Sequence, residues 1–180
     1  MQRAYAHHIR AMRPDDLDAI LAVQAACYPP AMQEAAEVLL ARMRAAGETC
    51  VIVEDGEGLC GYLFACPSRR GHVTPLGAEF DAAPDADTLY LHDLALAPRA
   101  HGRGLARWLV GHLLAQAREQ GLNASALVSV QDTAGFWTAL GYEAAGTSCP
   151  EARAALASYA GGARYMVSVL TAPGAPSQSC

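Results

Sequence analysis

The segment that most constrains the fold of this chain runs over residues 89–117. It reads LYLHDLALAPRAHGRGLARWLVGHLLAQA: an apolar strand, a break at Pro98, a loop that contains Gly102 and Gly104, and a helix with apolar side chains at helical spacing. The first N–H groups of a helix lack intrahelical partners, and the helix dipole favours an anion there. A glycine loop lets a phosphate approach this backbone, so the segment predicts a phosphate site. Three arginines add positive charge around the loop: Arg99, Arg103 and Arg107.

The spacing of the glycines narrows the choice of phosphate ligand. The chain has no GxxxxGK[ST] run for a nucleoside triphosphate, and its glycines do not form GxGxxG for a dinucleotide. What remains is HGRGLA over residues 101–106, reached from the strand through Leu96-Ala97-Pro98. This pattern resembles the Q/R-x-x-G-x-G/A signature of the GNAT superfamily of acyl-CoA-dependent N-acetyltransferases. The structural alternative is that the glycines only shape a tight turn.

The resemblance implies a site for acetyl-CoA along this unit. The loop is then expected to hold the pyrophosphate through six residues: His101, Gly102, Arg103, Gly104, Leu105 and Ala106. In the GNAT fold two parallel central strands splay apart, and the pantetheine arm pairs with the exposed backbone of the first. In this chain that backbone is expected to be Leu94, Ala95 and Leu96.

A second motif lies over residues 136–142. Its sequence, FWTALGY, resembles the FYxxxG[FY] signature of the same family, and it follows Gln131-Asp132-Thr133. By this resemblance Thr133 and Phe136 belong to the cofactor site. The chain departs from the family at Trp137, where many members have a tyrosine that protonates the departing thiolate. An indole N–H cannot play that part.

The strand over residues 89–96 carries two polar residues that require an explanation. Both of its faces are mostly apolar, so burial makes His92 and Asp93 costly unless they are paired or used. His92 is either a satisfied core histidine or the general base for an attacking amine, and its place just upstream of the cofactor loop favours the base. Asp93 is expected to orient His92 or to contact the acceptor. Strand neighbours point to opposite faces, so a bond between the two requires a bulge.

Length and charge limit the remaining classes. The chain has 180 residues, which suits one domain, expected over 1–170, with a disordered tail over 171–180. A net charge of −5 argues against nucleic acid as a partner. Six cysteines without ligand spacing predict free thiols and no metal site. No apolar stretch reaches the length of a membrane span and the N-terminus has no signal-peptide core, so we expect no membrane association and a cytoplasmic location.

The remaining elements complete the expected fold. Further strands are expected over residues 7–12, 50–54, 59–66, 123–130 and 163–170, and further helices over 15–28, 31–46 and around 136–140, with another from Glu151. This order is that of the GNAT fold: an α/β (α+β) domain whose mixed, mostly antiparallel central sheet splays between two parallel strands and is flanked by helices. Residues 67–87 form a long irregular segment, assigned to acceptor recognition or, alternatively, to a disordered surface loop. Tyr28 is a candidate wall of the acceptor site or, equally, a core tyrosine, and Glu79 is a candidate attractor of a cationic amine.

With the resemblance, these features predict an N-acetyltransferase. The acetyl group of acetyl-CoA would pass to an amine of a small molecule by direct attack on the thioester. The alternatives are a non-catalytic acyl-CoA-binding regulatory module and a general phosphate-binding domain. The identity of the amine stays open, and the sequence is compatible with a monomer or a homodimer. Since an unperturbed histidine loses its charge near neutral pH, His101 predicts that cofactor affinity falls as the pH rises.

Overall fold

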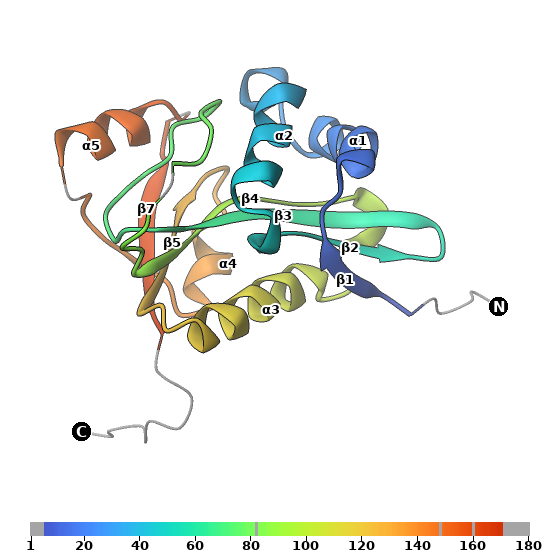
Figure 1. Ribbon diagram of the computed structural model, residues 1–180. Helices are drawn as coiled ribbons and strands as arrows, with labels where there is room; N and C mark the ends of the chain where they lie inside the picture. Colours follow the sequence, from blue (N-terminus) through green and yellow to red (C-terminus); the bar gives the residue numbers. More distant parts are fainter. Residues whose placement is uncertain (1–5, 82, 148, 160, 171–180) are drawn as a thin grey trace.

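Seven strands form one mixed sheet at the centre of the protein (Figure 1). The computed structural model describes residues 6–81, 83–147, 149–159 and 161–170, so the expected tail over 171–180 lies outside the described residues. The strands are β1 (His8–Ala11), β2 (Cys50–Asp55), β3 (Gly58–Ser68), β4 (Thr88–Leu96), β5 (Ala124–Ser129), β6 (Glu143–Ala144) and β7 (Arg164–Val169). Their order is β1-β2-β3-β4-β5-β7-β6, and the β4–β5 pair alone is parallel. The expected mixed, mostly antiparallel sheet is confirmed.

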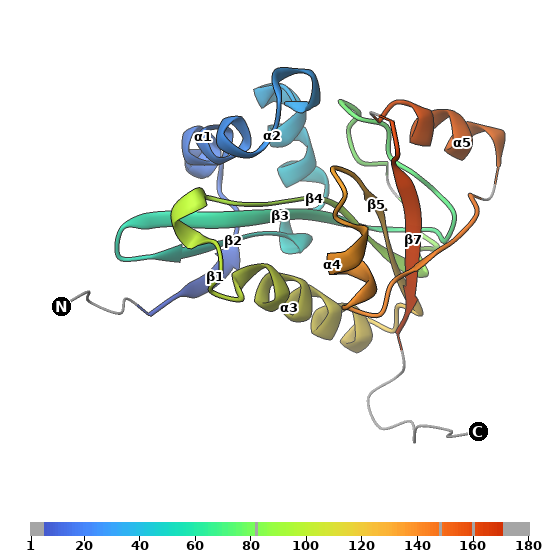
Figure 2. The ribbon, with the colours of Figure 1, turned by 180° about the vertical axis from the view of Figure 1, so that it is seen from behind.

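Helices cover both faces of this sheet. They are α1 (Leu17–Cys27), α2 (Ala36–Ala45), α3 (Leu105–Glu119), α4 (Ala134–Thr138) and α5 (Pro150–Ala157). Figures 1 and 2 show α1, α2 and α5 on one side of the sheet, and α3 and α4 on the other. Each side has its own hydrophobic core, with Tyr62 of β3 in the first and Leu63 in the second. Because successive residues of β3 and β4 enter different cores, these strands are buried on both faces.

Strands β4 and β5 separate part-way along their length. They pair over four residues, from Thr88 with Ala124 to Leu91 with Leu127. Beyond Leu91, β4 continues only against β3, and β5 continues only against β7. A gap therefore opens beside the C-terminal half of β4, which leads into the glycine loop and α3.

A bulge in the β3–β4 ladder changes the direction of two side chains. Phe64 pairs with Asp93 and Ala65 with Leu91, so His92 is an extra residue at this step. The bulge interrupts the alternation of faces, and His92 and Asp93 both take hydrogen-bond partners from the side of α1 and α2. Simple alternation, which places these neighbours on opposite faces, is therefore wrong here.

Two segments differ from the sequence-based expectation. The second helix begins at Ala36 and not near residue 31, because the side chain of Gln24 bonds both the N–H and the C=O of Glu34 and holds the connector extended. The short β6 was not expected.

The irregular segment after β3 is packed rather than free, with Val73 and Phe80 buried in the first core. In the part of the chain that is described, no helix is both long and apolar enough to cross a membrane.

Candidate active site

The gap between β4 and β5 opens into a cavity of about 440 Å³. Its walls come from the end of α1, from β4, from the end of β5 and from α4. The lining includes Cys27, Tyr28, His92, Asp93, Leu94, Ala95, Leu96, His101, Ala106, Thr133 and Phe136. Because the ladder between the two strands is interrupted here, the cavity has main-chain polar groups along one wall.

The edge of β4 that faces this cavity carries backbone groups that β5 does not pair beyond Leu91. The N–H of Ala97 bonds β3 at 2.8 Å, and backbone groups alternate in direction along an antiparallel strand. Leu94 and Leu96 therefore turn their N–H and C=O groups toward the gap. Side chains already meet them there: the Tyr28 hydroxyl lies 3.1 Å from the Leu94 oxygen, and Nε2 of His101 lies 3.0 Å from the Leu96 oxygen.

The glycine loop at the end of β4 presents a helix N-terminus. Gly102 and Gly104 both have φ of +75°, a conformation that side chains disfavour, and Gly104 is the N-cap of α3. Among the described residues no side chain caps α3, and the first turn of α3 carries no acidic residue. The N–H groups at this end are therefore available to an anion, and no carboxylate competes for them.

The three arginines around the loop have different partners. Arg99 holds the carboxylate of Asp55 through two hydrogen bonds of 2.9 and 3.1 Å, so its charge is already neutralised. Arg107 lies over the ring of Phe136, with the guanidinium carbon 5.7 Å from the ring centre. Arg103 is exposed. Of the three, Arg103 and Arg107 remain to add positive charge for a bound phosphate.

A buried carboxylate lies at the inner end of the cavity. The hydroxyl of Tyr28 donates to Oδ1 of Asp93 at 2.7 Å, and the hydroxyl of Tyr62 donates to Oδ2 at 2.9 Å. Burial raises the pKa of Asp93, and the hydrogen bonds from the two tyrosines offset only part of that shift. Asp93 is therefore a stronger base than an exposed aspartate.

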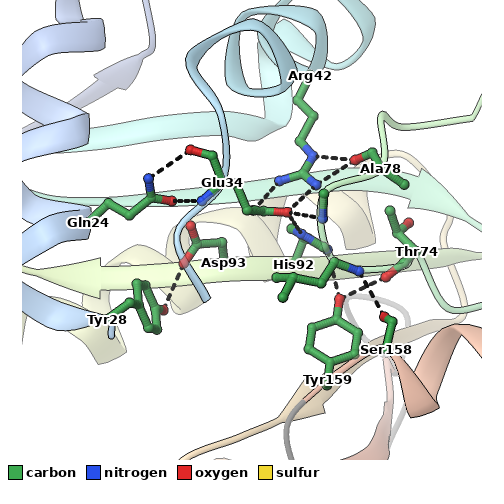
Figure 3. A network of polar contacts seen from close by, with 12 residues as sticks. Gln24, Tyr28, Glu34, Arg42, Thr74, Ala78, His92, Asp93, Ser158 and Tyr159 are labelled. Carbon is green, nitrogen blue, oxygen red and sulfur yellow. Dashed lines mark hydrogen bonds and ion pairs between the residues drawn. The ribbon is translucent and has the colours of Figure 1, made fainter. Parts of the chain in front are cut away.

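An ion pair between Glu34 and Arg42 lies beside this carboxylate (Figure 3). The guanidinium of Arg42 contacts both carboxylate oxygens of Glu34, at 2.5 and 2.6 Å, and Arg42 is fully buried. His92 lies between Glu34 and Tyr159, with Nε2 3.3 Å from Oε1 of Glu34 and Nδ1 3.4 Å from the tyrosine hydroxyl. Burial opposes the charge of Glu34, but the hydrogen bonds from His92 and Arg42 outweigh it and hold the pKa of Glu34 well below its usual value.

This network fastens the irregular segment and α5 to the sheet. Arg42 donates to the C=O of Ala78, Gly77 donates its N–H to Glu34 at 2.8 Å, and Tyr159 donates to the C=O of Thr74 at 2.7 Å. A second cavity of about 30 Å³ lies against it. Its lining shares Tyr28, His92, Asp93, Val128 and Val130 with the main cavity and adds Met32, Glu34, Leu76 and Tyr159. The two cavities therefore meet at His92 and Asp93.

Comparison with known proteins assigns this architecture to a family. The profile of the acetyltransferase (GNAT) family matches residues 17–142. The chain belongs to the GNAT family. A comparison with curated protein sequences finds no significant match.

Solved structures at low sequence identity share the GNAT fold. GphF, a GNAT-like decarboxylase in complex with isobutyryl-CoA, is 21% identical at a TM-score of 0.76, over 91% of this chain and 100% of that one. Ard1 from Thermoplasma volcanium is 16% identical at a TM-score of 0.69, over 92% and 99%. An N-acetylglutamate synthase from Neisseria gonorrhoeae, complexed with coenzyme A and N-acetyl-glutamate, is 18% identical at a TM-score of 0.69, over 94% of this chain and 36% of its own.

Membership of the GNAT family makes this chain an acyl-CoA-dependent acyltransferase. The cavity suits an acyl-CoA cosubstrate, because it joins an uncapped helix N-terminus to the edge of β4 that β5 leaves unpaired. Of the residues expected to bind the cofactor, the structure places seven in the cavity wall: Leu94, Ala95, Leu96, His101, Ala106, Thr133 and Phe136. Gly102, Arg103 and Gly104 are exposed in the loop, and the side chain of Leu105 is buried in the core beneath α3. Leu105 can therefore offer only its backbone.

Around His92 and Asp93, sequence reasoning missed the main polar residues. Glu34 and Arg42 lay within a segment expected to be one continuous helix, and nothing in the sequence links them to His92. The expected role of Tyr28 as a wall agrees with its place in the lining of both cavities. Glu79 is exposed and lines neither cavity.

Trp137 occupies the position of the usual GNAT tyrosine. Its ring packs edge-on against Phe136 and Tyr142, with ring centres 4.9 and 5.5 Å apart. Tyr142 itself is fully buried and bonds the hydroxyl of Ser125 at 2.7 Å. None of the three aromatic residues of this motif therefore offers an acidic hydroxyl to the cavity.

Proposed function

We propose that this chain is an N-acetyltransferase that moves the acetyl group of acetyl-CoA to the amine of a small molecule by direct attack on the thioester. One observation carries the proposal: a single cavity runs from His101 and Ala106, beside the glycine loop, to the buried Asp93 and His92. A cosubstrate with its pyrophosphate at the loop and its pantetheine arm along Leu94 and Leu96 directs its thioester toward these two side chains. The chemistry then takes place where the second cavity begins.

The acceptor side supports a small amine. The second cavity is small, its walls include the apolar side chains of Met32 and Leu76, and the carboxylate of Asp93 lies where it joins the main cavity. A carboxylate attracts a cationic amine, while apolar walls favour a compact hydrocarbon body. The charge of Glu34 is neutralised by Arg42, so Asp93 is the group that recognises the ammonium.

The amine must lose a proton before it attacks. A primary amine with a pKa of about 10 pays about 4 kcal/mol to be neutral at pH 7. The sequence favours His92 as base, but in the structure both nitrogens of His92 face other groups, Glu34 and Tyr159. Asp93 has a raised pKa and oxygens with further acceptor capacity. We therefore assign proton removal to Asp93 and positioning of the acceptor side to His92.

Acetyl transfer from acetyl-CoA to a panel of small amines, followed by product mass, tests this assignment. The wild-type chain is expected to acetylate at least one amine class, and Asp93→Asn is expected to lower kcat by about 10² or more. His92→Ala is expected to raise the KM for the amine more than it lowers kcat. A larger kcat loss in His92→Ala than in Asp93→Asn would return the role of base to His92. Binding of acetyl-CoA without transfer to any amine would favour the regulatory module.

A second candidate, decarboxylation of an acyl-CoA, is favoured by Trp137. Removing CO₂ from a carboxyl group β to the thioester leaves the C–S bond intact, so no departing thiolate needs an acid. One solved structure with this fold is a GNAT-like decarboxylase. Incubation with malonyl-CoA and methylmalonyl-CoA, followed by mass, tests it: loss of CO₂ without an amine would establish this reaction.

A further inference from the structure

Because Trp137 occupies the position of the usual GNAT tyrosine, the question arises which group protonates the departing thiolate. The described part of the chain contains six tyrosines: Tyr28, Tyr62, Tyr90, Tyr142, Tyr159 and Tyr165. Among them, Tyr28 alone lines the main cavity. Tyr62, Tyr90, Tyr142 and Tyr165 are fully or almost fully buried, and the hydroxyl of Tyr159 donates to the C=O of Thr74 at 2.7 Å. The search for a phenolic acid within the described residues therefore ends at Tyr28.

The position of the Tyr28 hydroxyl fits a role at the sulfur atom. Figure 3 shows Tyr28 beside Asp93, and the hydroxyl oxygen lies 2.7 Å from Oδ1 of Asp93. The same oxygen lies 3.1 Å from the C=O of Leu94, so it contacts both the buried carboxylate and the cavity-facing edge of β4. The glycine loop follows the C-terminal end of β4, and a pantetheine arm that starts there and runs along Leu96 and Leu94 brings its sulfur to this level. The ring comes from the end of α1, on the face of the sheet opposite α4.

We propose that Tyr28 protonates the departing CoA thiolate, in a proton loop with Asp93 that replaces the tyrosine missing at position 137. The inference rests on the proposed acetyl transfer. As the amine nitrogen forms its bond to the carbonyl carbon and the C–S bond breaks, the ammonium proton passes to Oδ1 of Asp93. The hydroxyl proton of Tyr28 passes to the sulfur, and the proton on Asp93 returns to the phenolic oxygen. The products are the amide and the free CoA thiol, and both side chains regain their starting states.

The proton loop between Tyr28 and Asp93 removes a difficulty that each of these two residues has alone. Burial and the nearby carboxylate raise the pKa of Tyr28 well above its usual value, so a free tyrosinate is costly. In the loop the phenol passes a proton on while it receives another, and no tyrosinate accumulates. Asp93, once protonated, returns to its ionised state without releasing a proton to solvent from a buried site.

The chain contains a matched control. Tyr62 also donates to Asp93, at 2.9 Å to the other carboxylate oxygen, but it is fully buried and does not line the main cavity. Tyr28→Phe and Tyr62→Phe both keep the ring and remove one hydrogen bond to Asp93. Any effect at the sulfur that is confined to Tyr28→Phe therefore cannot be an effect on Asp93 alone.

The first measurement needs CoA but no amine. CoA carrying ¹³C next to the thiol is bound to each chain, and its chemical shift is followed against pH, which separates this thiol from the protein cysteines. A hydroxyl that donates to the thiolate stabilises it, so Tyr28→Phe is expected to raise the pKa of the bound thiol by about one unit, a tenfold change. Tyr62→Phe is expected to change it much less. Asp93 and His92 face the same site and are unchanged in both variants. Equal titrations in the wild type and Tyr28→Phe would overturn the proposal.

The second measurement uses the acetyl-transfer assay. Tyr28→Phe is expected to lower kcat by about 10² while the KM for acetyl-CoA changes only a few-fold, and Tyr62→Phe is expected to lose clearly less. Equal losses of kcat in the two variants would show that Tyr28 only positions Asp93, and this result would overturn its role as the acid. If the wild type transfers no acetyl group, the proposed function fails separately, and the thiol titration still decides whether Tyr28 acts on the sulfur.

Discussion

The two halves of the site are built in different ways. The cofactor half uses main chain: the free edge of β4 and the glycine loop that begins α3. The acceptor half uses side chains from distant parts of the sequence, with the Glu34–Arg42 pair joined to His92 and Tyr159. A backbone site depends on local conformation, whereas a side-chain network depends on long-range packing. Substitutions in the two halves should therefore have different effects on stability and on binding.

The largest effect is expected from Arg42→Met in the acceptor half. The substitution leaves the carboxylate of Glu34 buried without its cation and removes the bond to the C=O of Ala78. Breaking a buried pair in this way costs about 3–5 kcal/mol of unfolding free energy, measurable by urea denaturation. The double variant Glu34→Gln/Arg42→Met removes both charges and should recover much of this loss. A double variant as unstable as the single one would show that packing of Arg42, and not its charge, stabilises this half.

Acid should weaken the same half. The pKa of Glu34 lies below its unfolded value of about 4.5, so its contribution to stability is complete at neutral pH and is lost as the pH falls below that value. The loss expected between pH 6 and pH 3 is about 2 kcal/mol in urea titrations. Other salt-bridged carboxylates titrate in this range, so the double variant Glu34→Gln/Arg42→Met is the reference. An equal loss in wild type and double variant would remove Glu34 from the acid response.

The difference between the two halves also explains which features could be predicted from the sequence. The strand, glycine loop and helix of the cofactor half could be predicted because their determinants are local: two glycines with positive φ lie in HGRGLA next to an apolar strand, and the strand–loop–helix order fixes their geometry. The order of helices and strands along the chain, apart from β6, and the parallel β4–β5 pair followed from the same resemblance. His92 and Asp93 were found because two polar residues in a strand buried on both faces require partners.

The partners themselves were not predictable, for two physical reasons. The direction of the Asp93 side chain depends on one extra residue in the β3–β4 register, which no local signal marks. Glu34 and Arg42 are eight residues apart, and their pairing depends on Gln24 holding the connector extended so that α2 starts late. Helical periodicity alone continues the helix through Glu34. Such a network is visible only once the tertiary packing is known.

In the cofactor half, Gly104→Ala should impair binding more than folding. Its φ of +75° costs a residue with a side chain about 1–2 kcal/mol, although a Cβ there would meet no neighbouring atom. The strain falls on the N-cap of α3, next to the N–H groups that would bind the pyrophosphate. The affinity for acetyl-CoA, measured by calorimetry, should therefore drop about tenfold. Gly111→Ala, within α3 and also without neighbours for a Cβ, is the control and should stabilise the chain by about 0.5–1 kcal/mol. Unchanged affinity in Gly104→Ala would mean that α3 does not bind the pyrophosphate.

The smallest expected effect tests whether side-chain charge matters at all in the backbone-built half. His101 lies beside the glycine loop with Nε2 3.0 Å from the C=O of Leu96, and it lines the cavity. A cation at this position adds to the attraction for a phosphate, by about two- to fivefold in affinity. His101→Arg carries a permanent positive charge, so it should bind acetyl-CoA more tightly than the uncharged His101→Gln by about this factor, measured as dissociation constants at one pH and low ionic strength. Equal dissociation constants in the two variants would show that side-chain charge at this position does not matter, and the cofactor half would then rest on backbone and arginine alone.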